Sequence, residues 1–290
     1  MRTYLDCYPC ILRQALGASR CAGANPEQQI SVIQNVLTLL QEILPEQTPP
    51  EIAHQVHRIV ADTISASDLY REAKRKSTED ALALYPDLKK LVEQSADPLD
   101  TAIRISIAGN IIDFGAYDHI EDLHSVVDRV ILQPYDINDT KNFRKKLSCA
   151  NQVLFLADNA GETVFDRILI ETLELPVIYA VKGGPILNDA LMEDAVAAGV
   201  HQCATLISNG SDAPGTILPL CSNEFCQIYD EMSLVIAKGQ ANYETLSEAG
   251  EKVFCLLLVK CPVIANDIGA PVGSIVVCQS RKPVSHQALI

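Results

Sequence analysis

Carboxylate, amide and lysine side chains stand directly after several apolar runs of this sequence. Asp158 and Asn159 follow one run, and Lys182 and Lys238 follow two others. Carboxylate and amide oxygens are the ligands that Mg²⁺ and Mn²⁺ prefer in proteins. Lysines beside glycines, whose backbone N–H groups are approachable, suit a phosphate group. These residue types together predict a site for a divalent metal ion and a phosphate.

The apolar runs have the length and composition of short buried strands, and helical patterns alternate with them. The expected strands are 152–157, 176–181, 203–208, 233–237, 253–259 and 274–278, and the expected helices are 161–173, 188–198, 222–229, 242–250 and 261–267. This alternation predicts an α/β fold, with a mostly parallel sheet covered by helices on both faces. The carboxyl ends of parallel strands meet at one edge, so five polar strand ends in this region should form one site.

The residues at that edge divide by charge. We expect Asp158, Asn159 and Asp189 to hold the metal ion. Lysines, glycines and helix starts should bind the phosphate, and they are Lys182, Gly183, Gly184, Asn188, Lys238, Gly239 and Asn242, with Lys260 as a weaker candidate. Each Asp or Asn taken alone could equally be a helix cap. The convergence of several strand ends favours the site.

Residues 1–148 have a helical pattern and residues 149–290 the alternating one, which predicts a helical subdomain and an α/β subdomain, or one integrated domain. Asn25-Pro26 and Asp97-Pro98 are typical helix starts. The pair Gly109-Asn110 is unusual for a helix interior, because glycine costs about 1 kcal/mol there. The basic run 74–76 is expected on a solvated helix face.

The composition excludes several classes of function. The 290 residues carry a formal net charge of −14, which argues against nucleic-acid and anionic-membrane partners. The longest apolar run, 253–259, is too short to span a bilayer. Ten cysteines, most of them in apolar runs, and an N-terminal segment unlike a signal peptide predict free thiols and a cytoplasmic location. The sequence does not determine the oligomeric state.

Cys7 and Cys10 form a CxxC pair near the start of the chain. They could provide half of a structural zinc site, completed by Cys21 or by the His54 and His57 pair. A redox role is disfavoured, because a redox CxxC usually follows a strand and none is expected here.

Five motifs together resemble the metal-dependent damage-control phosphatases, the ARMT-like superfamily. They are the CxxC at 7–10, GNIID at 109–113, DNAGE at 158–162, ILND at 186–189 and KGQANYE at 238–244. The resemblance covers nearly the whole chain and keeps the family's order. It implies a helical N-terminal part packed on a three-layer α/β/α part. One departure is Met232-Ser233, where family members often carry an acidic residue.

The resemblance also implies an activity: hydrolysis of phosphomonoesters of small metabolites, such as sugar phosphates, with Mn²⁺, Co²⁺, Ni²⁺ or Mg²⁺. The family's metal ligands match Asp158, Asn159 and Asp189, and its phosphate-contacting lysine matches Lys238. Glu162 and Asn110 are expected beside the same phosphorylated substrate. Asp158 is the carboxylate expected to act as base or nucleophile, and the sequence leaves these two roles open.

Two other functions remain open. A non-catalytic protein could bind a phosphorylated metabolite in the same crevice, although a pure phosphate binder gains nothing from Asp158 and Asp189. An S-adenosylmethionine-dependent methyltransferase would need more glycines after the first strand than DNAGE supplies. No GxGxxG or GxxxxGK[ST] nucleotide fingerprint is present.

Overall fold

The computed structural model describes the whole chain except residues 45, 65–67, 69, 111–126, 128 and 282–290. Within that part, seven strands form one sheet. Their order is β1 (Tyr135–Asn138), β7 (Ile275–Gln279), β6 (Val253–Leu258), β5 (Val235–Lys238), β2 (Val153–Leu156), β3 (Val177–Val181) and β4 (Thr205–Ser208). Neighbouring strands from β6 to β4 are parallel, whereas β7 is antiparallel to β6 and parallel to β1. The fold is therefore α/β with a mostly parallel sheet, as predicted.

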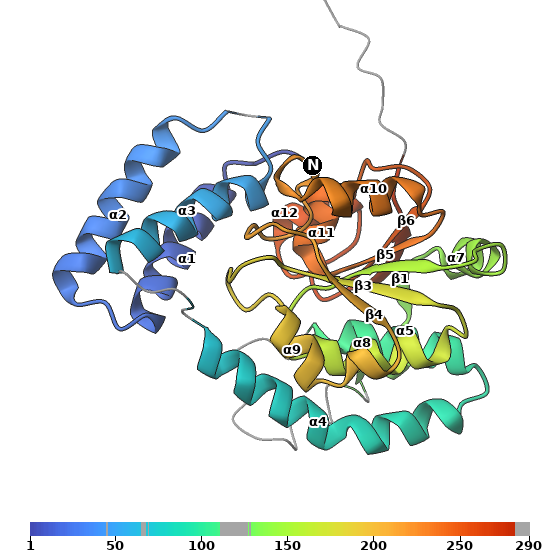
Figure 1. Cartoon of the computed structure of the whole chain (residues 1–290). Helices are drawn as coiled ribbons and strands as arrows, with labels where there is room; N and C mark the ends of the chain where they lie inside the picture. The colour runs from blue at the N-terminus through green and yellow to red at the C-terminus, as the bar shows by residue number, and fades with distance from the viewer. Residues whose placement is uncertain (45, 65–67, 69, 111–126, 128, 282–290) are drawn as a thin grey trace, which may run out of the picture.

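Helices cover both faces of the sheet (Figure 1). The helices on one face are α5 (Pro98–Gly109), α8 (Glu162–Thr172) and α9 (Met192–Ala197), with α4 (Arg71–Glu93) packed against them. The helices on the other are α10 (Asn223–Glu231), α11 (Gly239–Leu246) and α12 (Pro262–Ile268). Val153 and Phe155 of β2 enter the first core, and Leu154 and Leu156 enter the second. All four are buried, so this strand is apolar throughout rather than alternating.

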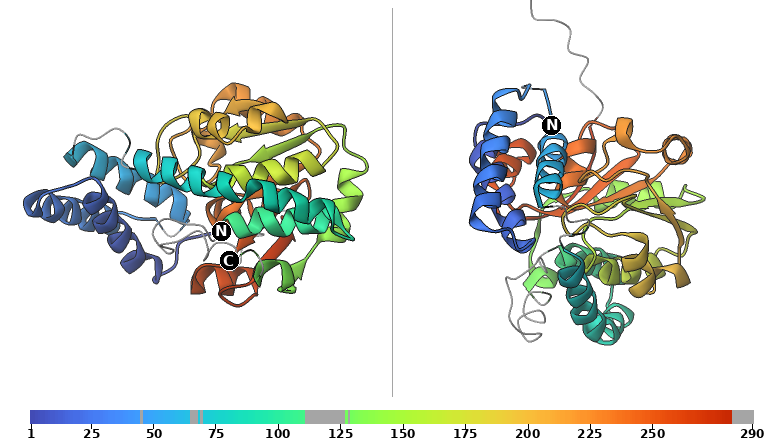
Figure 2. Two further views of the ribbon diagram at one scale, coloured as in Figure 1. Left: turned by 90° about the horizontal axis from the view of Figure 1, so that it is seen from below. Right: turned by 60° about the vertical axis from the view of Figure 1, so that its left-hand side comes forward.

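The first three helices form a bundle of their own beside the sheet (Figure 2). They are α1 (Cys7–Cys21), α2 (Pro26–Gln41) and α3 (Pro49–Ile64). Their apolar core reaches Val263 of α12, and α3 also contacts α11. The bundle consequently stands next to the helices that follow β5 and β6.

Residues 1–148 do not contain helices alone. β1 lies before residue 149 and belongs to the sheet, and α7 (Thr140–Leu147) follows it. Helix α5 also lies before this boundary, and Ile103, Ile105 and Ile107 share a core with the strands. The segment 1–148 thus contributes both the separate bundle and elements of the α/β part. The expectation of helices throughout this segment missed β1.

Several local features explain the helix ends. Asn25 caps α2 through a reciprocal capping box with Gln28, and Asp97 caps α5. Gly109 is the last residue of α5 and Asn110 its C-cap, so the unusual pair ends the helix rather than interrupting it. A Cβ at Gly109 would lie 3.0 Å from Phe165, which shows how closely α5 approaches α8.

The basic run 74–76 is only partly solvated. Lys74 is 1% exposed and pairs with Asp68 at 3.1 Å and Asp194 at 3.4 Å. Arg75 lies on the exposed face with Glu72 and Glu79. The expectation of a solvated face was therefore wrong for Lys74, because its charge is matched by acids from outside its own helix. In the described part of the chain, no helix is long and apolar enough to cross a membrane.

Candidate metal and phosphate site

Two loops at the carboxyl end of the sheet are joined by backbone hydrogen bonds. The loop after β2 carries Asp158 and Asn159, and the loop after β3 carries Asp189. Asn159 and Asp189 form an isolated antiparallel bridge, in which the Ala160 N–H donates to the Asn188 carbonyl at 2.9 Å and the Ala190 N–H donates to the Asp158 carbonyl at 2.8 Å. The three residues expected to bind metal are thus placed together by main-chain pairing.

The second loop contains a strained residue. Leu187 has a φ of 45°, in the left-handed region that side chains other than glycine rarely adopt. The Asp189 N–H closes the turn by donating to the Ile186 carbonyl at 3.1 Å. A non-glycine residue held in this conformation next to Asn188 and Asp189 is the kind of strain that concentrates at functional sites.

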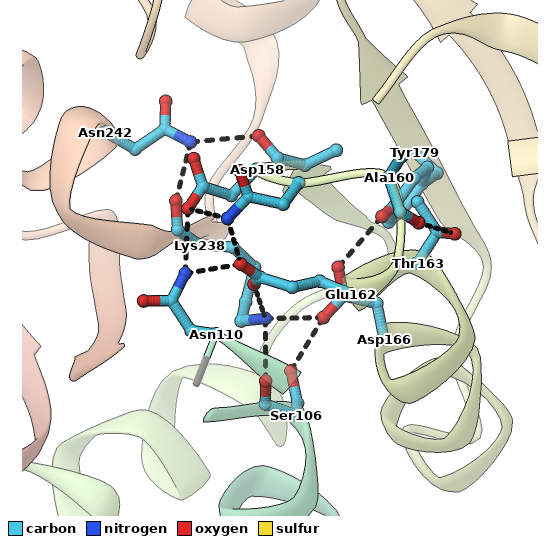
Figure 3. A network of polar contacts seen from close by, with 12 residues as sticks. Ser106, Asn110, Asp158, Ala160, Glu162, Thr163, Asp166, Tyr179, Lys238 and Asn242 are labelled. Carbon is cyan, nitrogen blue, oxygen red and sulfur yellow. Dashed lines mark hydrogen bonds and ion pairs between the residues drawn. The ribbon is translucent and has the colours of Figure 1, made fainter. Parts of the chain in front are cut away.

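The two aspartates and Glu162 form a buried group of like charges. Asp158 is 8% exposed, Glu162 1% and Asp189 3%. Burial, and then the charges of Glu162 and Asp189, raise the pKa of Asp158 well above its usual value. The Asn110 amide partly compensates, because its Nδ2 donates to Asp158 Oδ2 at 2.9 Å and also to Glu162 Oε1 (Figure 3).

These residues fit a divalent cation. Like-charged carboxylates in a buried site are stabilised by a bound cation, and oxygen donors suit Mg²⁺ or Mn²⁺. The buried Asn110 Oδ1 has no hydrogen-bond partner within the described structure, so an acceptor is available beside the carboxylates. Nowhere in the described residues do three or more His, Cys, Asp or Glu side chains form a metal-binding group. A metal held by Asp158 and Asp189 would therefore complete its coordination with amide oxygens such as that of Asn159, or with water.

Lys238 lies behind the carboxylates, away from solvent. It is completely buried, and its Nζ donates to Asp166 Oδ1 at 2.6 Å, to the Ser106 carbonyl at 2.9 Å and to Glu162 Oε2 at 3.1 Å (Figure 3). Burial alone would lower the pKa of Lys238, but the Asp166 and Glu162 carboxylates raise it, so the lysine stays charged. A direct contact with phosphate would require Lys238 to exchange one of these bonds.

Lys182 and Asn242 also have partners inside the protein. Lys182 Nζ donates to the Gly215 carbonyl and lies 3.4 Å from Asp189 Oδ2. Asn242 Nδ2 donates to the carbonyls of Lys238 at 2.8 Å and Ala157 at 3.1 Å, which ties α11 to β2. The helices expected to start near Asn188 and Asn242 instead begin at Met192 and Gly239. Neither asparagine therefore stands at a helix N-terminus.

The glycines at these strand ends allow close packing. The Gly183 N–H is already used, since it donates to the Ser211 carbonyl at 2.8 Å. A Cβ at Gly183 would lie 2.5 Å from Gly210, and one at Gly184 would lie 3.1 Å from Asp212. Gly239 has a φ of +77°, and a Cβ there would lie 1.7 Å from Asp158 Oδ2. Glycine at position 239 thus leaves the space that the Asp158 carboxylate occupies.

A cavity of about 680 Å³ opens onto the proposed metal ligands. Its walls come from the N-terminal bundle, the two bridged loops, α11 and the start of α12. The lining residues with polar or ionisable side chains are Asp6, Cys7, Cys10, Arg13, Gln14, Asp158, Asn159, Asn188, Asp189, Gln240, Glu244, Lys260 and Cys261. Of the expected phosphate-binding residues, Asn188 and Lys260 line the cavity, whereas Asn110, Glu162, Lys182, Lys238 and Asn242 lie behind its surface.

Sequence reasoning missed two groups of residues. Ser106 and Asp166 hold Lys238 in place, and no local motif indicates them. Gln240 and Glu244 line the cavity. Both belong to the KGQANYE motif, but neither was expected in the site. Four residues apart, they share one face of α11, and a helix start at Gly239 rather than Asn242 would have revealed this face.

Cys7 and Cys10 lie at the cavity wall rather than in a cysteine cluster. Cys7 is buried and Cys10 is exposed, and all ten cysteines are free. Of the expected partners, Cys21 is an exposed free thiol, His54 Nε2 lies 2.9 Å from Asp212 Oδ1, and His57 is 6% exposed. No group of three or more His, Cys, Asp or Glu side chains that could hold a metal occurs among the described residues. The structure therefore does not assemble a zinc site around this pair within its described residues. The last three residues of the GNIID motif, 111–113, lie outside the described residues.

Known proteins are similar to this chain over most of its length. The chain is 37% identical over 233 residues to a damage-control phosphatase of Archaeoglobus fulgidus, covering 78% of this chain and 80% of the relative. It is 31% identical over 288 residues to a damage-control phosphatase of Pyrococcus horikoshii, covering 97% and 99%.

A solved structure matches as closely. The crystal structure of a DUF89 family protein from Pyrococcus horikoshii superposes with a TM-score of 0.90 at 30% identity, covering 97% of this chain and 100% of that one. The model of the damage-control phosphatase ARMT1-like domain matches residues 3–276. This chain therefore belongs to the damage-control phosphatase ARMT1-like family.

Proposed function

We propose that this protein is a metal-dependent phosphatase that hydrolyses phosphomonoesters of small metabolites. One observation carries the proposal: main-chain pairing brings Asp158, Asn159 and Asp189 together at a cavity, where buried carboxylates repel one another. That arrangement is unfavourable without a cation and well suited to one. Membership of a phosphatase family supports the same reading.

Asp158, Asn159 and Asp189 would hold the metal ion. When bound, such an ion polarises a phosphoryl oxygen and offsets the charge that develops during phosphoryl transfer. Lys260 lines the cavity, and Lys182 lies behind it beside Asp189. Both lysines favour the charged form of Asp158 and so lower its pKa, which opposes the effect of burial. The same positive potential favours a phosphate dianion at the cavity floor.

The surrounding network keeps the reactive side chains in place. Asn110 holds the Asp158 and Glu162 carboxylates through one amide group. Lys238 forms ion pairs with Glu162 and Asp166 on the side away from the cavity. Because these groups are already ordered, little reorganisation is needed when charge develops on the substrate. We expect Asp158 to be the carboxylate that acts on the attacking water or on phosphorus.

The cavity volume suits a small metabolite, since small-molecule sites usually measure about 300–1,000 Å³. Sugar phosphates are among the substrates that we propose. The ten free cysteines favour a reducing compartment and, with it, a cytoplasmic location.

Phosphate release tests this function. Purified protein should be assayed with a panel of sugar phosphates, nucleotides and other phosphomonoesters, with Mn²⁺, Co²⁺, Ni²⁺ or Mg²⁺ added singly. We expect hydrolysis that requires one of these ions, stops with a chelator and is lost in the Asp158→Ala variant. Hydrolysis that resists the chelator and the substitution would refute the metal site. Saturable binding of phosphorylated metabolites without any release would instead indicate the non-catalytic carrier.

A further inference from the structure

Helix α11 turns a second carboxyl group toward the cavity. Its first residue, Gly239, packs against Asp158, and Gln240, Ala241 and Glu244 line the cavity wall. An α-helix rises 1.5 Å per residue, so the Glu244 backbone lies about 7.5 Å along the helix from Gly239. Glu244 therefore lines the same cavity as the proposed metal ligands, further along α11 than the residue that packs against Asp158.

The surroundings of Glu244 favour a protonated carboxyl group. The residue is 8% exposed, and its Oε1 accepts a hydrogen bond from Gln240 Nε2 at 3.1 Å. The charged and titratable groups that face it are Cys7 of α1, Asp267 of α12 and the Met1 ammonium, which donates to the Glu244 carbonyl at 3.0 Å. Burial raises the pKa of Glu244 to about 7, with the Asp267 charge adding to the rise and Gln240 and the ammonium opposing it.

The other ionisable groups at the cavity are less suited to donating a proton at neutral pH. Asp158 and Asp189 are proposed metal ligands. Burial raises the pKa of the Cys7 thiol, which keeps its proton bound. No histidine lines the cavity among the described residues. Glu244 alone combines burial, contact with the cavity and a proton that can be transferred near pH 7.

We propose that Glu244 is the general acid that protonates the leaving-group oxygen during phosphomonoester hydrolysis, an inference that rests on the proposed phosphatase function. Water adds to phosphorus, and the bond between phosphorus and the ester oxygen breaks with its electron pair staying on that oxygen. The Glu244 proton passes to the oxygen, which leaves as an alcohol. The attacking water gives up one proton to solvent, and the Glu244 carboxylate recovers one from solvent before the next turnover.

The test compares two leaving groups in the same protein sample. An alkyl phosphomonoester needs a proton on its leaving oxygen, whereas nitrophenyl phosphate releases a stable phenolate without one. Glu244→Gln keeps the shape and a carbonyl acceptor for Gln240 but has no acidic proton. We expect kcat for the alkyl ester to fall about a hundredfold or more, with kcat for the aryl ester changed less than about threefold.

The ratio of the two rates does not depend on the fraction of folded protein, so partial misfolding cannot imitate the effect. Glu248→Gln is the matched control, since Glu248 is exposed and lies four residues further along the chain. That variant should keep the wild-type ratio. Equal losses on both esters in Glu244→Gln would overturn the proposal and assign Glu244 a structural role.

A second measurement uses only the wild-type protein. As pH rises through about 7, Glu244 loses its proton, so the rate for the alkyl ester relative to the aryl ester should fall about tenfold per pH unit. A ratio that stays constant from pH 6 to 9 would contradict the proposal. If the wild type hydrolysed neither ester with any metal, the proposed phosphatase function itself would fail, and that outcome is distinct from either result above.

Discussion

The KGQANYE motif contributes residues to two regions of this protein, one closed to solvent and one open to it. Its lysine points into a closed network in which Lys238 Nζ meets Glu162, Asp166 and the Ser106 carbonyl away from solvent. Its glutamate, one and a half helical turns later, lines the open cavity. In the closed region each charge has an opposite charge in contact. In the open region Asp158, Asp189 and Glu244 are kept at the edge of a space that a ligand can enter.

This difference separates residues that hold the site from residues that act in it. A buried and fully paired charge is costly to disturb but has no contact to offer a substrate. A carboxyl group at a cavity wall has the reverse property, because it can contact a ligand that enters the cavity. Substitutions in the closed region should therefore reduce stability, and substitutions in the open region should reduce activity or change the response to pH.

The largest effect is expected from Asp158→Asn, in the open region. Phosphate release with the best metal should fall about a thousandfold, because a ligand and a reactive carboxylate are both lost. The unfolding free energy of the metal-free protein, measured in urea at pH 8, should rise, since one of three repelling carboxylates becomes neutral. Asp136→Asn, on the exposed side of β1, should change neither quantity. Lower stability of Asp158→Asn without metal would show that this carboxylate is already compensated.

Lys238→Met tests the closed region. The substitution leaves Glu162 and Asp166 buried without their cation, which should lower the unfolding free energy by about 3–5 kcal/mol. Lys76→Met removes an equal charge from an exposed position of α4 and should have little effect. A stable Lys238→Met protein with no activity would instead place Lys238 among the residues that contact substrate.

The response of stability to pH distinguishes the two carboxyl environments. The pKa of Glu244 is about 7 in the folded protein against 4.5 for the ordinary side chain. The folded state therefore binds the proton more tightly, and its stability declines as pH rises from about 4.5 to 7. Glu244 should contribute about 3 kcal/mol to this decline. Urea unfolding of wild type and Glu244→Gln across this range should show the difference, and parallel curves would contradict a raised pKa.

Gly239→Ala should have the smallest effect on stability, at the junction of the two regions. An alanine at φ +77° costs about 1–2 kcal/mol. Its Cβ would also displace the Asp158 carboxylate, which should weaken metal binding about 10–100-fold in a calorimetric titration. Gly250→Ala is the matched control, because Gly250 has a φ of +94° and nothing within 4 Å of an added Cβ. Gly250→Ala should lose only the stability that the positive φ costs and should keep wild-type metal affinity.

Much of the α/β part could be predicted from the sequence, because its strands are continuous apolar runs that end at polar residues and glycines. The six strands expected after residue 148 all appear within two residues of their predicted limits. β1 was missed because it is a four-residue edge strand in which half-buried and exposed residues alternate. Such a segment has too little apolar content to stand out, and only pairing with β7 makes it a strand.

The sequence could place the proposed metal ligands at one edge of the sheet, but it could not give the orientation of the side chains around them. Asp158, Asn159 and Asp189 follow strand ends, which topology alone brings to one edge. The direction of Lys238 depends on Ser106 and Asp166, which are 132 and 72 residues distant in the sequence. Side chains from distant helices thus decide whether a strand-end lysine faces solvent or the interior. Local patterns carry no information on that choice.

The position of β7 between β1 and β6 bears on how the chain acquires its structure. β1 comes from residues 135–138, yet its strand partner is β7 at residues 275–279. During synthesis β1 must therefore wait for about 140 further residues, roughly 7–28 s at 5–20 residues per second. Until then β1 and β6 each present an unpaired edge on which other strands can form. Chains shortened before residue 275 should consequently aggregate rather than yield a smaller folded enzyme, and a chaperone that shields strand edges should raise the yield of the full-length protein.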